Sequence, residues 1–498
     1  MRILYAASEV SPFAKTGGLA DVAGALPRAL ADLGHDIRVI LPKYRCVDAA
    51  RFGLERRGPP LRIEYGGRTI EVIPWVARVP EHPHPNLEVW FVGNDALYDR
   101  PGLYQDAGRD YPDNLERFAV FSRAILKFPR AFGWRPELLH ANDWQTALSL
   151  VGLHQQRPAD PDWQRVAGVF TIHNIGYQGL FPGRDFNHLG LPAHYFGIDW
   201  LEYYGRISLL KGGILAADAL TTVSPTYADE IQTPQYGHGL DGVLRLRGAS
   251  LVGIINGIDD GIWNPARDPL IPKPYDAADA SGKRACKAAL QHELGLPASA
   301  APVLGMISRL TIQKGIDLVL QILPELMLLD LQLVVLGSGD EEYHAQLADA
   351  QRKYPEKFAL RLAFDEGLAH RIEAGVDVCL MPSRYEPCGL NQLYSLRYGT
   401  IPIVRRTGGL ADTVVDATPS HLANGTATGF VFRDADGAAL LTAIRLALAE
   451  YRRPPAWAGM MRTAMRSDFS WNRSAQRYSE LYQAAAERIG GVRRSGPI

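Results

Sequence analysis

One six-residue segment, Thr-Gly-Gly-Leu-Ala-Asp, occurs twice in the chain, at 16–21 and at 407–412. A basic residue precedes each copy, Lys15 in the first and Arg406 in the second. Each copy also follows an apolar, strand-like run and opens a helix-like run. A glycine turn between strand and helix lets backbone approach a ligand closely and points helix N-terminal N–H groups at an anion, often a phosphate. The two copies are therefore candidate anion-binding turns, and Lys15 is a stronger candidate than Arg406.

A pair of cations follows a strand-like run in the second half of the chain. Arg309 and Lys314 lie in the segment 308–315, at the predicted mouth of the next helix. Arginine can hold a phosphate through two hydrogen bonds, and lysine acts as a point charge. Cations near a helix N-terminus are mildly unfavourable unless an anion is bound there, which favours a diphosphate site. A solvated loop with ordinary charges is the alternative.

A carboxylate lies in a second loop of the same half. Glu386 belongs to the segment 384–390, Arg-Tyr-Glu-Pro-Cys-Gly-Leu, which follows a strand-like run. Pro387 fits the first position of a helix and would leave the next amides free to point at a ligand. Glu386 would then lie beside a phosphate or a sugar. Charge compensation at the helix N-terminus is its alternative role.

Polar side chains also end predicted strands in the first half. Asp143 and His173 end successive strands, and Asn256 and Asp259 end another. A single histidine is usually structural, but polar groups at neighbouring strand ends favour a site. An Asn-Gly turn explains Asn256 almost as well. Together with the cations, these hydroxyl-binding groups suggest a sugar nucleotide as the ligand.

No metal or cofactor is required by this set of residues. Asp-x-Asp triplets occur at 160–162, in a loop, and at 434–436, where helix capping is the simpler role. Arg309, Lys314 and helix-end amides could stabilise a departing diphosphate without a metal. The sequence contains no P-loop motif, which excludes that class of ATPase. The glycine turn at 337–340 could pass the nucleotide.

These residues need elements that bring strand ends together. Short runs rich in Val, Ile, Leu and Phe alternate with longer amphipathic runs, which predicts two doubly wound parallel α/β sheets. The predicted strands are 2–8, 36–41, 137–141, 166–172, 219–223 and 251–255 in the first half and 303–308, 331–336, 358–364, 376–381, 401–404 and 429–432 in the second. The ligand is expected in a cleft where the carboxyl ends of both sheets face each other.

Three segments fall outside this alternation. Residues 61–79, with two glycines between alternating runs, predict a β-hairpin excursion from the first sheet. The Pro-rich segment 264–279 can continue neither a helix nor a central strand, so it is predicted to be an interdomain linker and hinge. A last helical stretch at about 471–486 could pack on either lobe.

Length and composition bound the class of protein. A chain of 498 residues with 47% hydrophobic residues is expected to form two to four domains, and two large lobes fit the duplicated turn. With 53 basic and 54 acidic residues it has no basic stripe, which argues against nucleic-acid binding. The four cysteines are scattered, which fits a reducing cytosol, and no apolar run reaches the roughly 18 residues of a membrane span. We expect a cytoplasmic protein, bacterial rather than plastid because no leader-like segment is evident.

In the sequence and order of its motifs, the chain resembles the bacterial glycogen synthases and plant starch synthases. These are retaining glucosyltransferases of the GT-B architecture. The motifs that carry the resemblance occur in order along nearly the whole chain: 8–10, 15–22, 99–102, 140–144, 171–174, 222–227, 256–259, 308–315 and 384–393. The resemblance implies two Rossmann-like domains across a deep cleft, ADP-glucose as donor and the non-reducing end of an α-1,4-glucan, such as glycogen, as acceptor. The products would be ADP and a glucan longer by one glucose.

The family's residue roles carry over to the matching positions. The resemblance implies that the catalytic residues are Glu386, Lys314, Arg309, His173 and Asp143, with Asp143 near the acceptor. It implies that the donor is bound by Lys15, Gly17, Gly18, Asp21, Asn256, Arg309, Lys314, Phe364, Cys388, Gly389 and Leu390. Neither a metal nor a cofactor is implied. Phe364 is a departure, because the family commonly has tyrosine there, and the hydroxyl that could bond the nucleobase is lost.

The resemblance also implies a division of labour along the chain. Residues 1–260 would form an acceptor-side domain, 261–468 a donor-side domain, and 469–498 a C-terminal helix that could pack back on the first domain.

Retention of configuration is compatible with a double displacement on a carboxylate or with attack on the same face as the leaving phosphate. A GT-B transferase that uses UDP-glucose or another acceptor is the alternative enzyme. A two-lobed glucan- or sugar-binding protein is the alternative outside enzymes.

Overall fold

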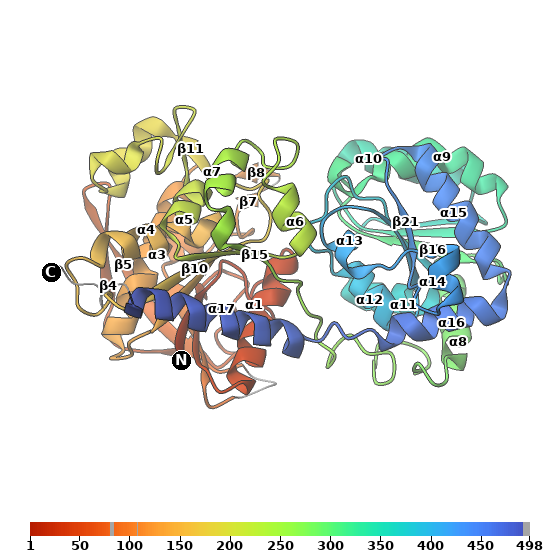
Figure 1. Cartoon of the computed structure of the whole chain (residues 1–498), viewed down its shortest axis with the longest axis horizontal. Coiled ribbons are helices and arrows are strands. Elements are labelled where there is room, and N and C mark those ends of the chain that lie inside the picture. Colours follow the sequence, from red (N-terminus) through yellow and green to blue (C-terminus); the bar gives the residue numbers. More distant parts are fainter. Residues whose placement is uncertain (80–83, 107, 492–498) are drawn as a thin grey trace. The chain divides into compact units, whose positions relative to one another are not determined.

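The computed structural model describes residues 1–79, 84–106 and 108–491. Within them the chain forms two compact units (Figure 1). Unit 1 consists of Met1–Gly257 together with the segment that starts at Trp471, and unit 2 consists of Ile258–Ser470. The end of the predicted segment 469–498 lies outside the described residues, because the description stops at residue 491.

Unit 1 is built on a sheet that has ten strands in the described residues, in the order β15-β14-β10-β9-β1-β2-β6-β5-β3, with β4 paired to β5. Its strands are β1 Arg2–Ala6, β2 Asp36–Pro42, β3 Glu55–Arg56, β4 Leu61–Tyr65, β5 Arg68–Ala77, β6 Leu87–Gly93, β9 Leu138–Asn142, β10 Ala167–Ile172, β14 Ala219–Thr222 and β15 Leu251–Gly253. From β1 the chain first adds β2 and β6 on one side and later β9, β10, β14 and β15 on the other. This reversal of direction defines a doubly wound sheet with its switch point between β1 and β9.

All six strands predicted for this half form, with small shifts at their ends. The predicted hairpin is also confirmed, because β4 and β5 pair antiparallel around Gly66 and Gly67, whose φ angles are 58° and 75°. The prediction that the hairpin leaves the first sheet is wrong. β5 pairs with β6, a strand that the sequence reading missed, so the hairpin extends one edge of the main sheet.

Helices cover this sheet, and the last of them comes from the far end of the chain. The helices of unit 1 are α1 Gly18–Asp32, α2 Asp95–Tyr98, α3 Asn114–Ala131, α4 Trp144–Gln156, α5 Leu209–Ala216, α6 Pro225–Glu230, α7 Asp241–Leu246 and α17 Trp471–Gly491. α17 packs beside α1 and against β10 (Figure 1). It is fixed there by two hydrogen bonds, one of 2.9 Å between the Ser479 hydroxyl and the ring of His35 and one of 2.7 Å between the Tyr482 hydroxyl and the ring of His140.

Two small antiparallel sheets complete the strands of unit 1. One comprises β11 Leu180–Pro182, β12 Glu202–Tyr203 and β13 Arg206–Ser208, and the other comprises β7 Gln105–Asp106 and β8 Arg109–Asp110. Neither contributes a predicted site residue.

Unit 2 contains a six-stranded parallel sheet in the order β18-β17-β16-β19-β20-β21. Its strands are β16 Val303–Ile307, β17 Gln332–Leu336, β18 Phe358–Arg361, β19 Val378–Met381, β20 Ile401–Arg405 and β21 Phe430–Phe432. All six correspond to predicted strands. The spatial order is 3-2-1-4-5-6 of the Rossmann fold, which places the switch point between β16 and β19.

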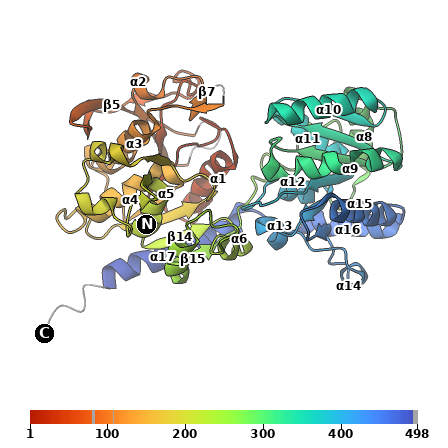
Figure 2. The same cartoon turned by 90° about the horizontal axis from the view of Figure 1, so that it is seen from above.

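The side chains of this sheet alternate between two hydrophobic layers, because successive residues of a strand point to opposite faces. The helices of unit 2 are α8 Ser281–Leu294, α9 Ile316–Leu328, α10 Glu341–Lys353, α11 Glu366–Gly375, α12 Asn391–Arg397, α13 Gly408–Thr413, α14 Pro419–Ala423, α15 Gly437–Tyr451 and α16 Pro454–Arg466. Helices α9, α10, α15 and α16 share one layer, while α8 and α11 share the other. α15 and α16 lie side by side (Figure 2).

The prediction of a hinge at 264–279 is wrong. The segment is packed into unit 2, where Asp268, Ile271 and Tyr275 are buried. The ring of His370 lies 2.7 Å from Asp268 Oδ2, and Tyr398 donates a 2.6 Å hydrogen bond to the same oxygen. Proline excludes helix and central strand, but it does not prevent an irregular segment from being anchored by its apolar and acidic residues.

The units are connected at Gly257–Ile258 and again at Ser470–Trp471. Within 1–79, 84–106 and 108–491, no helix combines the length and the apolar character that crossing a membrane requires.

Candidate functional site

In each unit several of the predicted residues follow strands at or beside the switch point of the sheet, whereas Asn256 and Phe364 follow the edge strands β15 and β18. In unit 1, the loop after β1 carries Glu9 and Lys15, and the residues after β9 and β10 are Asp143 and His173. In unit 2, the loop after β16 carries Arg309 and Lys314, and the loop after β19 carries Glu386. Ligands of open α/β sheets bind outside the carboxyl ends of the strands at such a point. Each unit thus contains one group of candidate residues, here called a half-site.

The loop that leads into α1 is held by Glu9, a residue for which the sequence reading proposed no role. Its carboxylate accepts hydrogen bonds from the amides of Thr16 and Gly17, at 2.5 Å and 3.1 Å, and from the Thr16 hydroxyl at 2.7 Å. Tyr104 donates a further hydrogen bond of 2.7 Å to it. The expectation that the first amides of this turn point at a ligand phosphate is therefore wrong for Thr16 and Gly17. A carboxylate of the chain itself occupies them.

The same loop presents Lys15 on the outer side of this anchor. Its ammonium group forms an ion pair of 2.8 Å with Asp21, in the first turn of α1. Both side chains are about one quarter exposed, at 26% and 29%. Gly17 is exposed, and a side chain added there would meet nothing within 4 Å. Among the predicted donor residues, Lys15, Gly17 and Asp21 thus form one accessible group.

The ends of β9 and β10 are joined by hydrogen bonds between predicted residues. Asp143 Oδ1 accepts a hydrogen bond of 2.8 Å from the backbone amide of His173. His173 Nε2 lies 2.9 Å from Oδ1 of Asn142, the last residue of β9. Asp143 reaches this position with a φ of 54°, which is strained for a residue other than glycine. Backbone strain of this kind is found preferentially where a side chain must be aimed.

Both titratable groups of this cluster have strongly shifted pKa values. Burial raises the pKa of Asp143 to about 7, although hydrogen bonds from the backbone of His173 and Asn174 lower it. Burial lowers the pKa of His173 to about 3. The imidazole is therefore neutral at neutral pH, and the carboxyl is close to its midpoint, as is expected of a group that exchanges a proton in a reaction.

Asn256 provides an unused acceptor in unit 1. Its side chain is only 5% exposed, and in the described part of the chain its Oδ1 atom has no hydrogen-bond partner. A buried amide oxygen without a donor is costly. A ligand hydroxyl would remove that cost, which agrees with the predicted role of Asn256 in donor binding.

The half-site of unit 2 is centred on an ion pair. Lys314 Nζ lies 2.6 Å from Oε2 of Glu386, and the Ser383 hydroxyl donates a hydrogen bond of 2.9 Å to the same oxygen. The side chain of Glu386 is 7% exposed and that of Lys314 is 18% exposed. Lys314 lies just before α9, as predicted, and Gly315, with a φ of 71°, makes the turn between Lys314 and the helix.

Arg309 lies in the same loop and contacts the Glu386 segment through one intermediate. Its guanidinium donates a hydrogen bond of 3.1 Å to Gln313, whose amide donates at 3.4 Å to the carbonyl of Tyr385. The buried guanidinium of Arg405 donates to the carbonyls of Ser383 and Arg384. The loop before Glu386 is thus braced from both neighbouring strands.

The second copy of Thr-Gly-Gly-Leu-Ala-Asp has a different environment from the first. Gly408 and Gly409 are buried, and a Cβ at either position would lie 1.9 Å from the carbonyl oxygen of Glu386 or 2.1 Å from that of Cys388. The Gly409 amide donates hydrogen bonds to the carbonyls of Glu386 and Pro387, each at 3.1 Å. This copy therefore packs against the backbone of the Glu386 loop, whereas both glycines of the first copy are exposed.

Two details of the Glu386 loop differ from expectation. Pro387 is not the first residue of a helix, because α12 begins at Asn391 with Leu390 as its N-cap. Gly389, two residues before Asn391, adopts a φ of 72°, so the backbone there is not helical. Cys388 is buried, and the Gln392 side chain bonds the carbonyls of Cys388 and Gly389.

Phe364 and the glycine turn at 337–340 are the other two predicted contacts with the nucleotide. Phe364 lies between β18 and α11 and is 77% exposed, so its ring is available for stacking. Gly337 and Gly339 allow the close approach of protein backbone. A Cβ at these positions would lie 1.8 Å and 2.2 Å from the carbonyl oxygens of Ser308 and Leu310.

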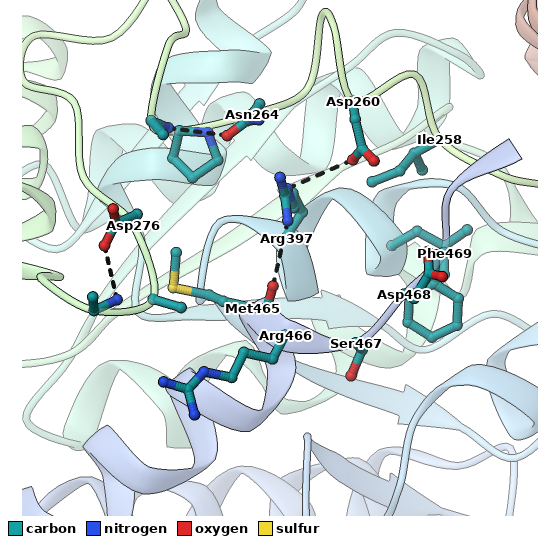
Figure 3. A pocket seen from close by; sticks show the side chains of 15 residues that line it. Ile258, Asp260, Asn264, Asp276, Arg397, Met465, Arg466, Ser467, Asp468 and Phe469 are labelled. Carbon is teal, nitrogen blue, oxygen red and sulfur yellow. Dashed lines mark hydrogen bonds and ion pairs between the residues drawn. The ribbon is translucent and has the colours of Figure 1, made fainter. Parts of the chain in front are cut away.

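A pocket of about 520 Å³ that the sequence did not predict lies in unit 2, next to both connections to unit 1 (Figure 3). Arg397 points towards Asp260, at 3.6 Å, and Ser467, Asp468 and Phe469 line another side. None of the predicted site residues lines this pocket. Within the described residues, His, Cys, Asp and Glu side chains form no cluster of three or more suited to a metal ion.

Comparisons with known proteins agree with both halves of this description. The chain matches the family model for the starch synthase catalytic domain over residues 2–246 and that for glycosyl transferases group 1 over residues 292–459. It is 51% identical to a glycogen synthase of Anaeromyxobacter dehalogenans, over 98% of this chain and 100% of the relative. It is 47% identical to glycogen synthase 1 of Methylococcus capsulatus, over 97% of each chain.

Solved structures show the same relationship. The catalytic domain of starch synthase IV from Arabidopsis thaliana, bound to ADP and acarbose, matches with a TM-score of 0.89 at 33% identity, over 97% of this chain and 99% of that one. Sucrose-phosphate synthase from Thermosynechococcus elongatus shares the fold, with a TM-score of 0.58 at 19% identity over 97% and 98% of the chains. Two doubly wound units with charged loops at both switch points define a glycosyltransferase of the GT-B architecture, as predicted. Within that class, the chain belongs to the family of glycogen synthases and starch synthases.

Sequence reasoning missed the residues that hold the predicted ones in place: Glu9, Asn142 and Ser383. Asn142 ends β9 directly before Asp143, and Glu9 lies in the loop between β1 and Lys15, so the position of both residues was a usable signal. Ser383 gave no signal, since its contact with Glu386 depends on the conformation of the loop between them.

Proposed function

We propose that the protein transfers glucose from ADP-glucose to the non-reducing end of an α-1,4-glucan such as glycogen, with retention of configuration and release of ADP. The observation that carries this proposal is the Lys314–Glu386 ion pair at the switch point of unit 2. A cation held at that point is positioned for a diphosphate, and the carboxylate beside it is positioned for the sugar attached to that diphosphate.

In this proposal unit 2 binds the nucleotide-sugar donor and unit 1 contributes the acceptor side. Arg309 and Lys314 neutralise the diphosphate as it leaves, and charge that is already in place costs little reorganisation during the reaction. Glu386 faces the transferred glucose, with the backbone of Cys388, Gly389 and Leu390 beside it. Phe364 stacks on the adenine.

Unit 1 completes the set of interactions with the same donor. Lys15, paired with Asp21 in the free protein, contacts a donor phosphate, and the turn at Gly17 and Gly18 allows close approach of the sugar. Neutral His173 and the unused oxygen of Asn256 hold glucose hydroxyls. Asp143 lies towards the acceptor, whose hydroxyl must lose a proton during transfer. Its pKa near 7 suits that proton exchange.

The choice of ADP-glucose rests on the relatives, one of which was solved with ADP bound. A single assay tests donor and reaction together. Purified protein is incubated with glycogen and radiolabelled ADP-glucose or UDP-glucose, and label is counted in the precipitated glucan. We expect incorporation from ADP-glucose at a rate well above that from UDP-glucose. Preference for UDP-glucose would refute the donor assignment, and absence of transfer from both would refute the transferase.

A further inference from the structure

Asn142 makes an unusually complete set of hydrogen bonds beside the site of unit 1. It ends β9 and its side chain is fully buried. Its Nδ2 donates a hydrogen bond of 2.9 Å to the carbonyl of Ala6, at the end of the neighbouring strand β1. Its Oδ1 lies 3.2 Å from the Tyr5 hydroxyl and 2.9 Å from Nε2 of His173.

These contacts determine which ring nitrogen of His173 carries the proton. The Ala6 carbonyl can only accept, so the nitrogen of the Asn142 amide must face it. The amide oxygen then faces His173, and since that oxygen can only accept, Nε2 must donate. In a neutral imidazole the other nitrogen, Nδ1, is left without a proton and acts as an acceptor. The low pKa of His173, which burial causes, agrees with a neutral ring.

The backbone of His173 is fixed by the next residue along the chain. Asp143 Oδ1 accepts the His173 amide at 2.8 Å, so two consecutive residues hold one histidine, Asn142 by its ring and Asp143 by its main chain. The unusual φ of Asp143 permits this arrangement. The ring can then neither rotate nor shift without breaking a buried hydrogen bond.

We propose that Asn142 is a positioning residue that keeps His173 in the Nε2-protonated tautomer, so that Nδ1 accepts a hydrogen bond from a hydroxyl of the transferred sugar. This inference deepens the proposed function and rests on it for the identity of the ligand. It assigns a direction to the contact, with the sugar hydroxyl as donor and the histidine as acceptor. A ligand group that can only accept hydrogen bonds would be rejected at this point.

The protonation state can be measured without substrate. ¹⁵N-histidine-labelled protein is studied by NMR at neutral pH, and the His173 signals are assigned by their loss in His173→Gln. We expect a protonated Nε2 and an unprotonated Nδ1 in the wild type and in Tyr5→Phe. Tyr5→Phe is the matched control, because it removes the other donor to Asn142 Oδ1. In Asn142→Leu the tautomer should no longer be fixed. A wild-type ring protonated on Nδ1 would overturn the inference without any variant.

Kinetics provide the second measurement. Asn142→Leu should lose about tenfold or more in kcat/KM for ADP-glucose, the worth of roughly one hydrogen bond, while Tyr5→Phe should stay within about twofold. If Asn142→Leu keeps both the tautomer and kcat/KM of the wild type, Asn142 does not position His173. Failure of the wild type to transfer glucose would refute the proposed function but not the tautomer assignment, so the two failures are distinguishable.

Discussion

Lys314 and Glu386 are 72 residues apart in the sequence, yet Nζ of one lies 2.6 Å from Oε2 of the other. They meet because β16 and β19 are neighbours in the sheet of unit 2, and each residue lies in the loop that follows its strand. In the proposed function, a diphosphate bound at this point would compete with Glu386 for the ammonium group of Lys314.

Removal of the Lys314 charge should affect activity and stability in separable ways. Lys314→Met should lower kcat by about 100-fold or more, as loss of one preorganised group that stabilises developing charge does. It should also lower the free energy of unfolding by about 2–4 kcal/mol, because Glu386 is left buried without its partner. The double variant Lys314→Met/Glu386→Gln should recover stability but not activity. Thermal unfolding and initial rates check this, and recovery of both would contradict the role of the charge.

Weakening the Glu9 anchor should loosen the Lys15 loop. Glu9→Gln replaces charge-assisted hydrogen bonds to the amides of Thr16 and Gly17 with weaker neutral ones. We expect KM for ADP-glucose to rise roughly tenfold, equivalent to about 1.4 kcal/mol, in steady-state kinetics. Tyr104→Phe is the control, since it removes another contact of the same carboxylate and leaves those amides bound. Equal effects of both substitutions would argue against loop anchoring.

The two copies of the repeated segment allow a matched pair of substitutions. Gly17→Ala places a methyl group in open space at an extended φ, so stability should change by less than about 0.5 kcal/mol. Gly408→Ala places it 1.9 Å from the Glu386 carbonyl oxygen at a φ of 42° and should cost about 2–4 kcal/mol. Denaturant unfolding measures both. Donor KM should rise in Gly17→Ala if that turn approaches the sugar. Similar stability losses at the two sites would be inconsistent with the described environments.

The raised pKa of Asp143 predicts a pH dependence of stability. Between the ordinary value of about 4 and the folded value of about 7, the folded protein binds a proton that the unfolded chain has released. This contribution to stability is present below about pH 4 and is lost as the pH rises through 7. Asp143→Asn lacks it, so its stability relative to the wild type should increase from about pH 5 to about pH 8, by at most about 1.4 kcal/mol per pH unit. The lowered pKa values of His140 and His173 contribute to the pH dependence of stability in both the wild type and the variant, so their contributions largely cancel in the difference. A difference that does not vary with pH would disprove the shift.

The sequence was sufficient for most strands of the two main sheets, although not for β6, and for the strand ends at which most candidate residues lie. Parallel strands buried on both faces appear as continuous apolar runs, and a polar residue directly after such a run is easily seen. Asp143 and His173 follow this rule, and each predicted strand is present. In contrast, the ion pair of Lys314 with Glu386 depends on loop conformations that no periodicity encodes. Gly315 and Gly389 both adopt positive φ angles on either side of that contact.

The misread segment at 264–279 shows the limit in another way. Its prolines predict irregular backbone, and the backbone is indeed irregular. Whether such an irregular segment connects domains or packs on one of them depends on its partners. Asp268, in the segment, contacts His370 and Tyr398, which lie 102 and 130 residues further along the chain. The ring of Trp263, directly before the segment, is stacked 3.8 Å from both His370 and Tyr394.

The position of α17 has a consequence for how the protein is made. Unit 1 begins at the first residue of the chain, but its buried His140 is covered by Tyr482, which leaves the ribosome only after all of unit 2 has been synthesised. Domains usually finish folding in the order of their synthesis. In this protein, unit 1 is synthesised first but can be completed only after unit 2 has been synthesised, because α17 is needed to cover it.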